Sequence, residues 1–359
     1  MEKDYSKHQM RKLVIFLSSI AAIFFFFTIL FFPKIVSAST AMTNDGIPMD
    51  ITHDQLTNDT VLKEEKDAIV GIILGYGYRT DDLNWNIAGT SQGTDPNILS
   101  ELTWKDLTIH QLSLGIRTLR NRSIYLKGAF DYGWIVDGEN QDSDYNEDDR
   151  QGEFSRSNNQ SDEGNTLDFS IGMGYPISFG SDFLSLAPVI GYSYHRQELH
   201  MMDGYQTIMK EYQTIPPLGP FPGLDSTYDA TWKGPWIGLD LNMGLKKINR
   251  YFRFVELCIG YEHHWATYDA TADWNLRTDF MHPKSFEHEA DGQGDKISLG
   301  LKNRLGKVTT LGIFYEQQQW TTQSGIDRVF KTNGQVIETR LNEVNWDSNV
   351  VRFEISIRF

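Results

Sequence analysis

The side chains that could do chemistry in this 359-residue chain are concentrated in one acidic stretch, between about residues 137 and 165. Carboxylates at such density can bind a divalent cation or, where two lie close together, activate a water molecule. The simpler interpretation is a hydrated surface loop whose charges repel one another. Only Arg150 and Arg156 oppose the negative charge there. The ten acidic residues are Asp137, Glu139, Asp142, Asp144, Glu147, Asp148, Asp149, Glu153, Asp162 and Glu163.

The elements that must position this stretch are predicted by a change of period along the chain. From about residue 68 onward, apolar and polar residues alternate at period two, which is the pattern of β-strands with two different faces. The connections are alternately short, about 2 to 6 residues, and long, which is how outer-membrane barrels are built. The ten expected strands are roughly 68–88, 102–117, 123–136, 166–178, 183–198, 227–245, 251–267, 295–305, 308–320 and 346–359.

The polar face of these segments is rich in glycine, serine and charged residues, which suits the crowded, wet interior of a barrel better than a solvent-facing surface. A closed barrel also leaves no unpaired strand edge in lipid. The sequence therefore predicts an all-β fold, a ten-stranded antiparallel transmembrane β-barrel with five long extracellular loops and short periplasmic turns. A soluble sandwich is the alternative. Five tryptophans near strand ends are expected to mark the membrane interfaces: Trp85, Trp104, Trp134, Trp265 and Trp320.

The first residues predict export. A basic segment precedes a long apolar run, and small residues at 36–38 offer a cleavage site, so residues 1–38 are expected to be a signal peptide. The run is long enough to serve instead as a retained membrane anchor. Residues 39–67 are expected to be a periplasmic lead-in of little structure, and residues 68–359 the barrel domain. Cys258 is the only cysteine, which excludes an intrachain disulfide, and the net charge of −15 argues against nucleic acid as a partner.

The inward-facing charges of the expected strands are predicted to form a paired, hydrated network, because isolated charges there would be costly. Such a network in a ten-stranded barrel leaves at most narrow files of water. This argues against a general diffusion pore, although a small cation-selective path stays open as an interpretation. Gly172 and Gly174 are expected to leave space inside the barrel for large neighbours.

Ten strands with five long loops resemble the omptin outer-membrane proteases. In that family two close acids activate the attacking water, and residues 135–139 (IVDGE), with Asp137 and Glu139, resemble that site. The family pairs these acids with an Asp-x-His couple. Residues 271–275 (TADWN) match it at Asp273 but have Asn275 in place of the histidine. An amide cannot act as a general base near pH 7, so the resemblance leaves the site incomplete.

The chain also resembles the Protochlamydia outer membrane protein family, over most of residues 68–359. The resemblance is carried by residues 143–150 (SDYNEDDR), 153–159 (EFSRSNN), 168–170 (DFS) and 172–176 (GMGYP). It implies an omptin-like barrel in the outer membrane, with porin-like behaviour suggested for some members, and no established catalytic residues.

Two functions are therefore carried forward. The first is a non-catalytic outer-membrane protein acting in surface interaction or limited permeation, with outer-membrane lipid and an extracellular ligand on the acidic loops as partners. The second is an omptin-like endopeptidase with an altered site made of Asp137, Glu139, Asp273 and Asn275. No cofactor and no metal ion is expected for either function.

Overall fold

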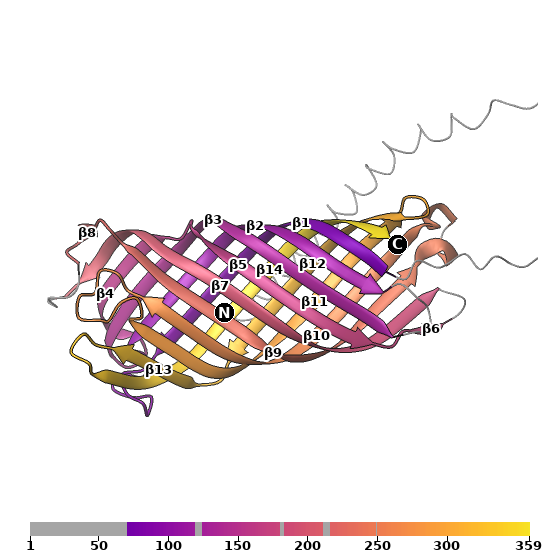
Figure 1. Cartoon of the computed structure of the whole chain (residues 1–359). Coiled ribbons are helices and arrows are strands. Elements are labelled where there is room, and N and C mark those ends of the chain that lie inside the picture. Colours follow the sequence, from indigo (N-terminus) through magenta and orange to yellow (C-terminus); the bar gives the residue numbers. More distant parts are fainter. Residues whose placement is uncertain (1–69, 119–123, 180–182, 211–215, 249) are drawn as a thin grey trace, which may run out of the picture. The chain divides into compact units, whose positions relative to one another are not determined.

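A ring of ten long antiparallel strands forms the body of the molecule, and each strand pairs with the next one along the ring (Figure 1). The computed structural model describes residues 70–118, 124–179, 183–210, 216–248 and 250–359. The ring closes because β1 pairs with β14 as well as with β2. Its strands are β1 (Val70–Ile87), β2 (Ser100–Thr118), β3 (Tyr125–Glu147), β5 (Gly164–Gly174), β7 (Leu184–Met209), β9 (Asp225–Gly244), β10 (Val255–Asp273), β11 (Phe286–Arg304), β12 (Thr309–Thr322) and β14 (Val336–Arg358).

These ten strands correspond one to one with the segments expected from the alternation, and the all-β barrel is confirmed. The expected signal peptide and lead-in lie outside the described residues. Within the described part of the chain, helical structure is limited to two short 3₁₀ turns, η3 (Leu245–Lys247) and η4 (Arg250–Phe252). No helix there is long and apolar enough to cross a membrane.

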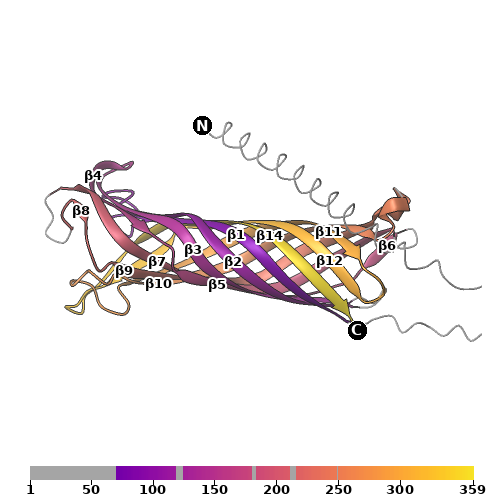
Figure 2. The same ribbon diagram turned by 90° about the horizontal axis from the view of Figure 1, so that it is seen from above.

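The strands continue well past the expected ends on one side of the barrel. The acidic stretch is not a loop over most of its length: β3 runs on to Glu147, and β4 (Gln151–Gln160) returns beside it. This hairpin is held on both sides, since β3 also pairs with β2 and β4 also pairs with β7. At the same end lie β8 (Gly219–Pro220) and β13 (Gly325–Phe330), whereas β6 (Ile177–Phe179) and the C-terminus lie at the opposite end (Figures 1 and 2).

Apolar side chains cover the outer face of the ring and are exposed there, which is the reversed arrangement expected for a barrel in lipid. Leu114 and Ile116 on β2 are 51% and 54% exposed, and Ile190 on β7 is 60% exposed. The belt ends on β3 at Trp134 and Val136, beyond which the outward residues become polar. The strands above this line therefore stand outside the membrane.

The expectation for the tryptophans is correct for two of the five. Trp134 and Trp265 point outward at 45% and 47% exposure, as interfacial residues do. Trp85, Trp104 and Trp320 are instead at most 3% exposed and lie inside the barrel. A tryptophan near a strand end suits either face, and the parity of its position within the strand decides which face it takes.

Candidate functional site

Two one-residue bulges decide which acidic side chains face the interior of the barrel. On β3, Ile109 and Thr108 of β2 oppose Ile135 and Asp137, so Val136 is an extra residue. On β2, the extra residue falls between Lys105 and Thr108, where Asp106 has a φ of +52°. A bulge of one residue exchanges the two faces of a strand beyond it.

The bulges therefore place Asp137 and Glu139 on the outer face, where both are exposed. Simple alternation from the buried Ile135 would have put both of them inside. The structure does not bring these two acids into the barrel mouth. The acids that face inward there are Asp142 and Asp144, which we call the acidic pair.

The acidic pair lies on β3 at the extracellular mouth. Asp142 accepts a hydrogen bond from the side chain of Trp274, and Asp144 is hydrogen-bonded to Ser100 and Ser155. Burial raises the pKa of both carboxyls, and the charge of Asp144 raises the pKa of Asp142 further, while Arg277 opposes these effects. None of these four partners can accept a proton near neutral pH, so the acidic pair has no general base among them.

Asp273 and Asn275 are in separate contacts. Asp273 is hydrogen-bonded to His282 Nδ1, so an imidazole does reach this aspartate, but from the turn before β11. Asn275 accepts from the Asp225 backbone N–H at 3.1 Å and donates to the Gly223 carbonyl at 2.7 Å, which ties the start of β9 in place. Within the described residues, no contact joins the Asp273–His282 couple to the acidic pair.

The interior of the extracellular half is filled by a cluster of large apolar side chains, which we call the aromatic plug. It packs rings from all around the barrel: the rings of Trp320 and Trp346 stack with centroids 5.5 Å apart, and Trp232 lies 5.7 Å from Trp320. The main members, each at most 3% exposed, are Leu83, Trp85, Leu102, Trp104, Leu107, Ile109, Leu199, Tyr228, Trp232, Tyr268, Trp320 and Trp346.

Glycines on the adjacent strands, paired directly with the tryptophans, leave space for the rings inside the barrel. A Cβ at Gly294 would lie 2.3 Å from the ring of Trp320, and one at Gly191 would lie 2.3 Å from the ring of Trp236 lower in the barrel. The expectation for Gly172 is confirmed, because its missing Cβ leaves space for the same Trp236. At Gly174, an added Cβ would instead lie 2.3 Å from the backbone carbonyl oxygen of Pro188.

Beneath the plug, charged side chains are paired across the interior, as expected from the sequence. Arg79 is 1% exposed and binds Asp81 and Asp168, each at 2.6 Å. His195 also bonds Asp168, at 2.8 Å. Two further groups repeat the pattern: Lys127 binds Asp240 and Glu262, and Arg352 binds Glu316 and Glu354. A small cavity lined by Arg79, Asp131 and Asp168, among others, has a volume of about 20 Å³, which is room for about one water molecule.

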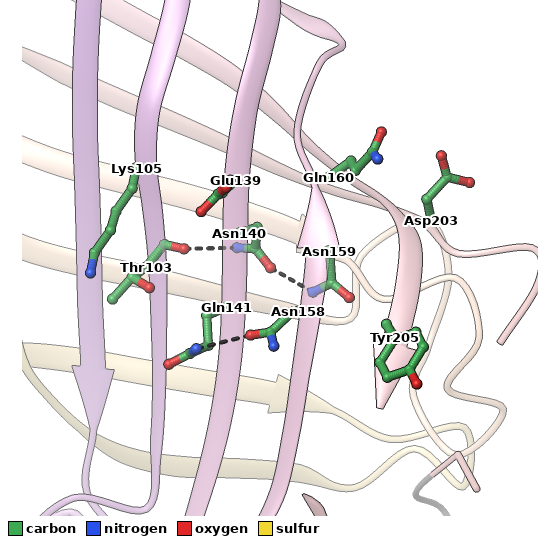
Figure 3. A pocket seen from close by; sticks show the side chains of 10 residues that line it. All are labelled: Thr103, Lys105, Glu139, Asn140, Gln141, Asn158, Asn159, Gln160, Asp203 and Tyr205. Carbon is green, nitrogen blue, oxygen red and sulfur yellow. Dashed lines mark hydrogen bonds between the residues drawn. The ribbon is translucent and has the colours of Figure 1, made fainter. Parts of the chain in front are cut away.

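Sequence reasoning did not identify a hollow on the outer face of β2, β3, β4 and β7 (Figure 3). Its volume is about 610 Å³, within the range of pockets that bind small ligands. We call it the outer hollow. Its signal in the sequence is the run of amides at 158–160, of which Asn158 and Gln160 are exposed on the outer face and Asn159 is buried between them. The lining residues are Thr103, Lys105, Glu139, Asn140, Gln141, Asn158, Asn159, Gln160, Asp203 and Tyr205.

Hydrogen bonds between amides link the strands beneath and beside this hollow. Gln141 donates to Asn158 Oδ1 at 2.9 Å, and Asn159 donates to Asn140 Oδ1 at 2.7 Å (Figure 3). Asn140 and Asn159 are buried, whereas Tyr205 is 51% exposed at the far wall. In the part of the chain that the structure describes, no group of three or more His, Cys, Asp or Glu side chains is placed to hold a metal ion.

Comparison with known proteins assigns the fold and the compartment. A family model described as Protochlamydia outer membrane protein matches residues 73–359. Among solved structures, the outer membrane protease OmpT from Escherichia coli has a TM-score of 0.64 at 13% identity, over 82% of this chain and 98% of that chain. OprG from Pseudomonas aeruginosa has a TM-score of 0.29 at 11% identity, over 82% and 97%. No curated protein matches the chain.

Proposed function

Since the chain belongs to the Protochlamydia outer membrane protein family and is an outer-membrane β-barrel, we propose that it is a non-conducting, non-catalytic barrel that binds a ligand at its extracellular end. The observation that carries this proposal is the filled interior. A permeation path needs a continuous column of water, and two successive layers oppose one here.

The upper layer is the aromatic plug, whose closely packed rings fill the space that a water column would need, with the indole N–H groups of Trp85, Trp104 and Trp232 buried among them. The lower layer is polar, and its buried cations Arg79, Lys127 and Arg352 are each paired with carboxylates. An ion passing through would have to replace those pairs, at the cost of leaving buried charges unpaired. What remains for function is the outer surface of the strands that stand above the membrane.

Planar-bilayer recording of the purified full chain tests the proposal. The expected result is no current above the lipid baseline, while a sixteen-stranded porin inserted in the same bilayers conducts. A steady current from the wild-type chain, altered in ion selectivity by Arg352→Met, would show that the interior conducts and would contradict the proposal.

Peptide hydrolysis is the second candidate, and the Asp273–His282 couple is the observation that favours it. It would need that couple to act with the acidic pair or with Asp137 and Glu139. Incubating the reconstituted protein with a mixed peptide library tests it, with Asp142→Asn and Asp137→Asn as variants. Cleavage by the wild type that is lost in either variant would establish the peptidase and overturn the non-catalytic proposal.

A further inference from the structure

We propose that the outer hollow binds a neutral oligosaccharide. The inference deepens the proposed function and rests on it, because it names the ligand class for the surface that the filled interior leaves available. The observations that carry it are the chemistry of the lining side chains, their free hydrogen-bonding atoms, the balance of charge and the position of the hollow relative to the membrane.

Most of the lining side chains are neutral and can hydrogen-bond. An amide offers donors at its nitrogen and an acceptor at its oxygen, so a row of amides matches a ligand whose groups both donate and accept. Sugar hydroxyls do both, whereas the apolar ligands of most pockets of this size do neither. The lining thus selects for a ligand with many hydroxyl groups.

Gln141 and Asn158 supply the sharpest match. Their mutual hydrogen bond uses Gln141 Nε2 and Asn158 Oδ1. Among the described contacts, Gln141 Oε1 and Asn158 Nδ2 take no part in a hydrogen bond. The pair therefore keeps one free acceptor and one free donor, at the two ends of its hydrogen bond, and the hydroxyls of a sugar can donate to the one and accept from the other (Figure 3).

Tyr205 adds an aromatic surface to these polar groups. It pairs with Asn158 across the junction of β4 and β7, and half of its side chain is exposed. Two residues before it, Asp203 has a φ of +48° at the bulge near this end of β7. An exposed phenol ring beside amides offers the apolar face of a sugar ring a stacking surface, while the hydroxyl edges meet the amides.

The charges at the hollow argue against a phosphorylated ligand. Lys105 is the one cation in the lining, and its direct partner in the strand register is Glu139. Asp203 adds a second negative charge at the opposite wall. A phosphate would meet two carboxylates and one ammonium group, and it would lack the clustered cations that bind phosphate well. An uncharged saccharide carries no such penalty.

The position of the hollow permits two sources of saccharide. Glu139 lies three residues above Val136, where the apolar belt on β3 ends, so the hollow begins within about 10 Å of the membrane surface. The headgroup of a neutral glycolipid in the same membrane reaches this height, and a free glycan from the medium reaches it equally. Both present the same neutral rings.

Titration of the full chain in detergent micelles with maltotriose, chitotriose and lactose, followed by calorimetry, tests the proposal. The second arm uses vesicles with and without lactosylceramide and measures the same affinity for headgroups in the membrane. Saturable binding in the first arm alone assigns a free glycan, and binding in the vesicle arm alone assigns a glycolipid. Either result supports the proposal.

Variants then place the binding at the hollow. Tyr205→Ala and the double change Gln141→Ala with Asn158→Ala are each expected to weaken binding at least about 10-fold, equal to about 1.4 kcal/mol. Tyr205→Phe keeps the ring and should bind within about twofold of wild type. Gln319→Ala removes an exposed amide on β12, bonded to Asp347 at 3.0 Å, and serves as the matched control without effect.

No binding of any of these saccharides in either arm would overturn the inference. So would equal affinity in the Tyr205→Ala variant, or tighter binding of maltotriose phosphate or of unrelated peptides than of the neutral sugars. Bilayer recordings on the same preparation separate the two proposals. A silent barrel without sugar affinity refutes only the ligand, whereas a conducting barrel refutes the proposed function.

Discussion

The interior of the barrel is filled in two different ways along its length. In the membrane-spanning half, the inner face is polar and its charges are paired, as around Arg79; in the extracellular half, the same strands present the rings of the aromatic plug. Ion pairs stabilise the first half and packed rings stabilise the second, and substitutions are expected to cost stability differently in the two halves. Removing one member of a buried ion pair leaves its partner charged and unsatisfied, whereas removing a methyl-sized volume from packed rings costs in proportion to its size.

The largest effect is expected for Arg79→Met. The change keeps the volume but leaves Asp81 and Asp168 buried without their cation, so the free energy of unfolding should fall by about 3–5 kcal/mol. Urea titration of the protein refolded into lipid vesicles, followed by tryptophan fluorescence, measures it. A loss below about 1 kcal/mol would mean that water reaches and solvates the two carboxylates.

A smaller loss is expected for Gly294→Ala in the plug. The added methyl group would meet the ring of Trp320, which is held on its other side by Trp346 and Trp232, and overpacking of this kind costs about 1–3 kcal/mol. The same urea titration gives the value. The control is Gly128→Ala on β3, a strand glycine where the nearest atom to the added methyl group would be a methyl carbon of Ile116 at 3.1 Å and not a ring. A loss there equal to that at Gly294 would assign the effect to backbone conformation, not packing.

The acidic pair at the mouth gives a pH dependence. Since the pKa of Asp142 is raised in the folded protein, the folded state binds its proton more tightly than the unfolded state. Its contribution is then full below the pKa of the unfolded chain and is lost as the pH rises through the raised value. The stability of the wild type relative to Asp142→Asn should therefore fall from about pH 4 toward neutral pH, because the amide in the variant does not ionise. Identical urea midpoints across pH in both proteins would contradict the assignment.

The smallest effect is expected for Arg196→Met on the outer face. Arg196 binds Asp229 at 2.5 Å, but both side chains are about one-third exposed, and such pairs contribute about 0–1 kcal/mol. The comparison with Arg79→Met therefore isolates burial, because the removed residue type is the same. A loss at Arg196 as large as that at Arg79 would refute the difference between the two faces.

Most of the fold follows from the sequence because alternation at period two is a local property of each strand. The ten strands, the outward apolar belt and the paired interior charges were all predictable on that basis. The hairpin of β3 and β4 was not, because more than half of its residues in 137–147 and 151–160 are aspartate, asparagine, glutamate or glycine, which are depleted in strands. Pairing with β2 and β7 on its two sides outweighs that preference.

The candidate site was less predictable for the same reason. Assigning Asp137 and Glu139 to the interior requires unbroken alternation, and the extra residue Val136 interrupts it. The residue types around Val136 do not predict the bulge on β3. On β2, Asp106 gives a weak indication of one, since aspartate tolerates a positive φ better than most residues. The acidic pair and the outer hollow are both consequences of these interruptions.

The extra residue at Val136 also determines how this surface can change over generations. Loss of its single codon would remove the bulge and leave the residues beyond it on their present faces, because Asp137 already pairs with Thr108. Loss of one regularly paired residue above the bulge, such as Asn140, would instead turn Gln141 inward and Asp142 outward, and would remove the amide pair and the acidic pair at once without altering the membrane-spanning strands below. Point substitutions, by contrast, can remodel the two sides of this wall independently.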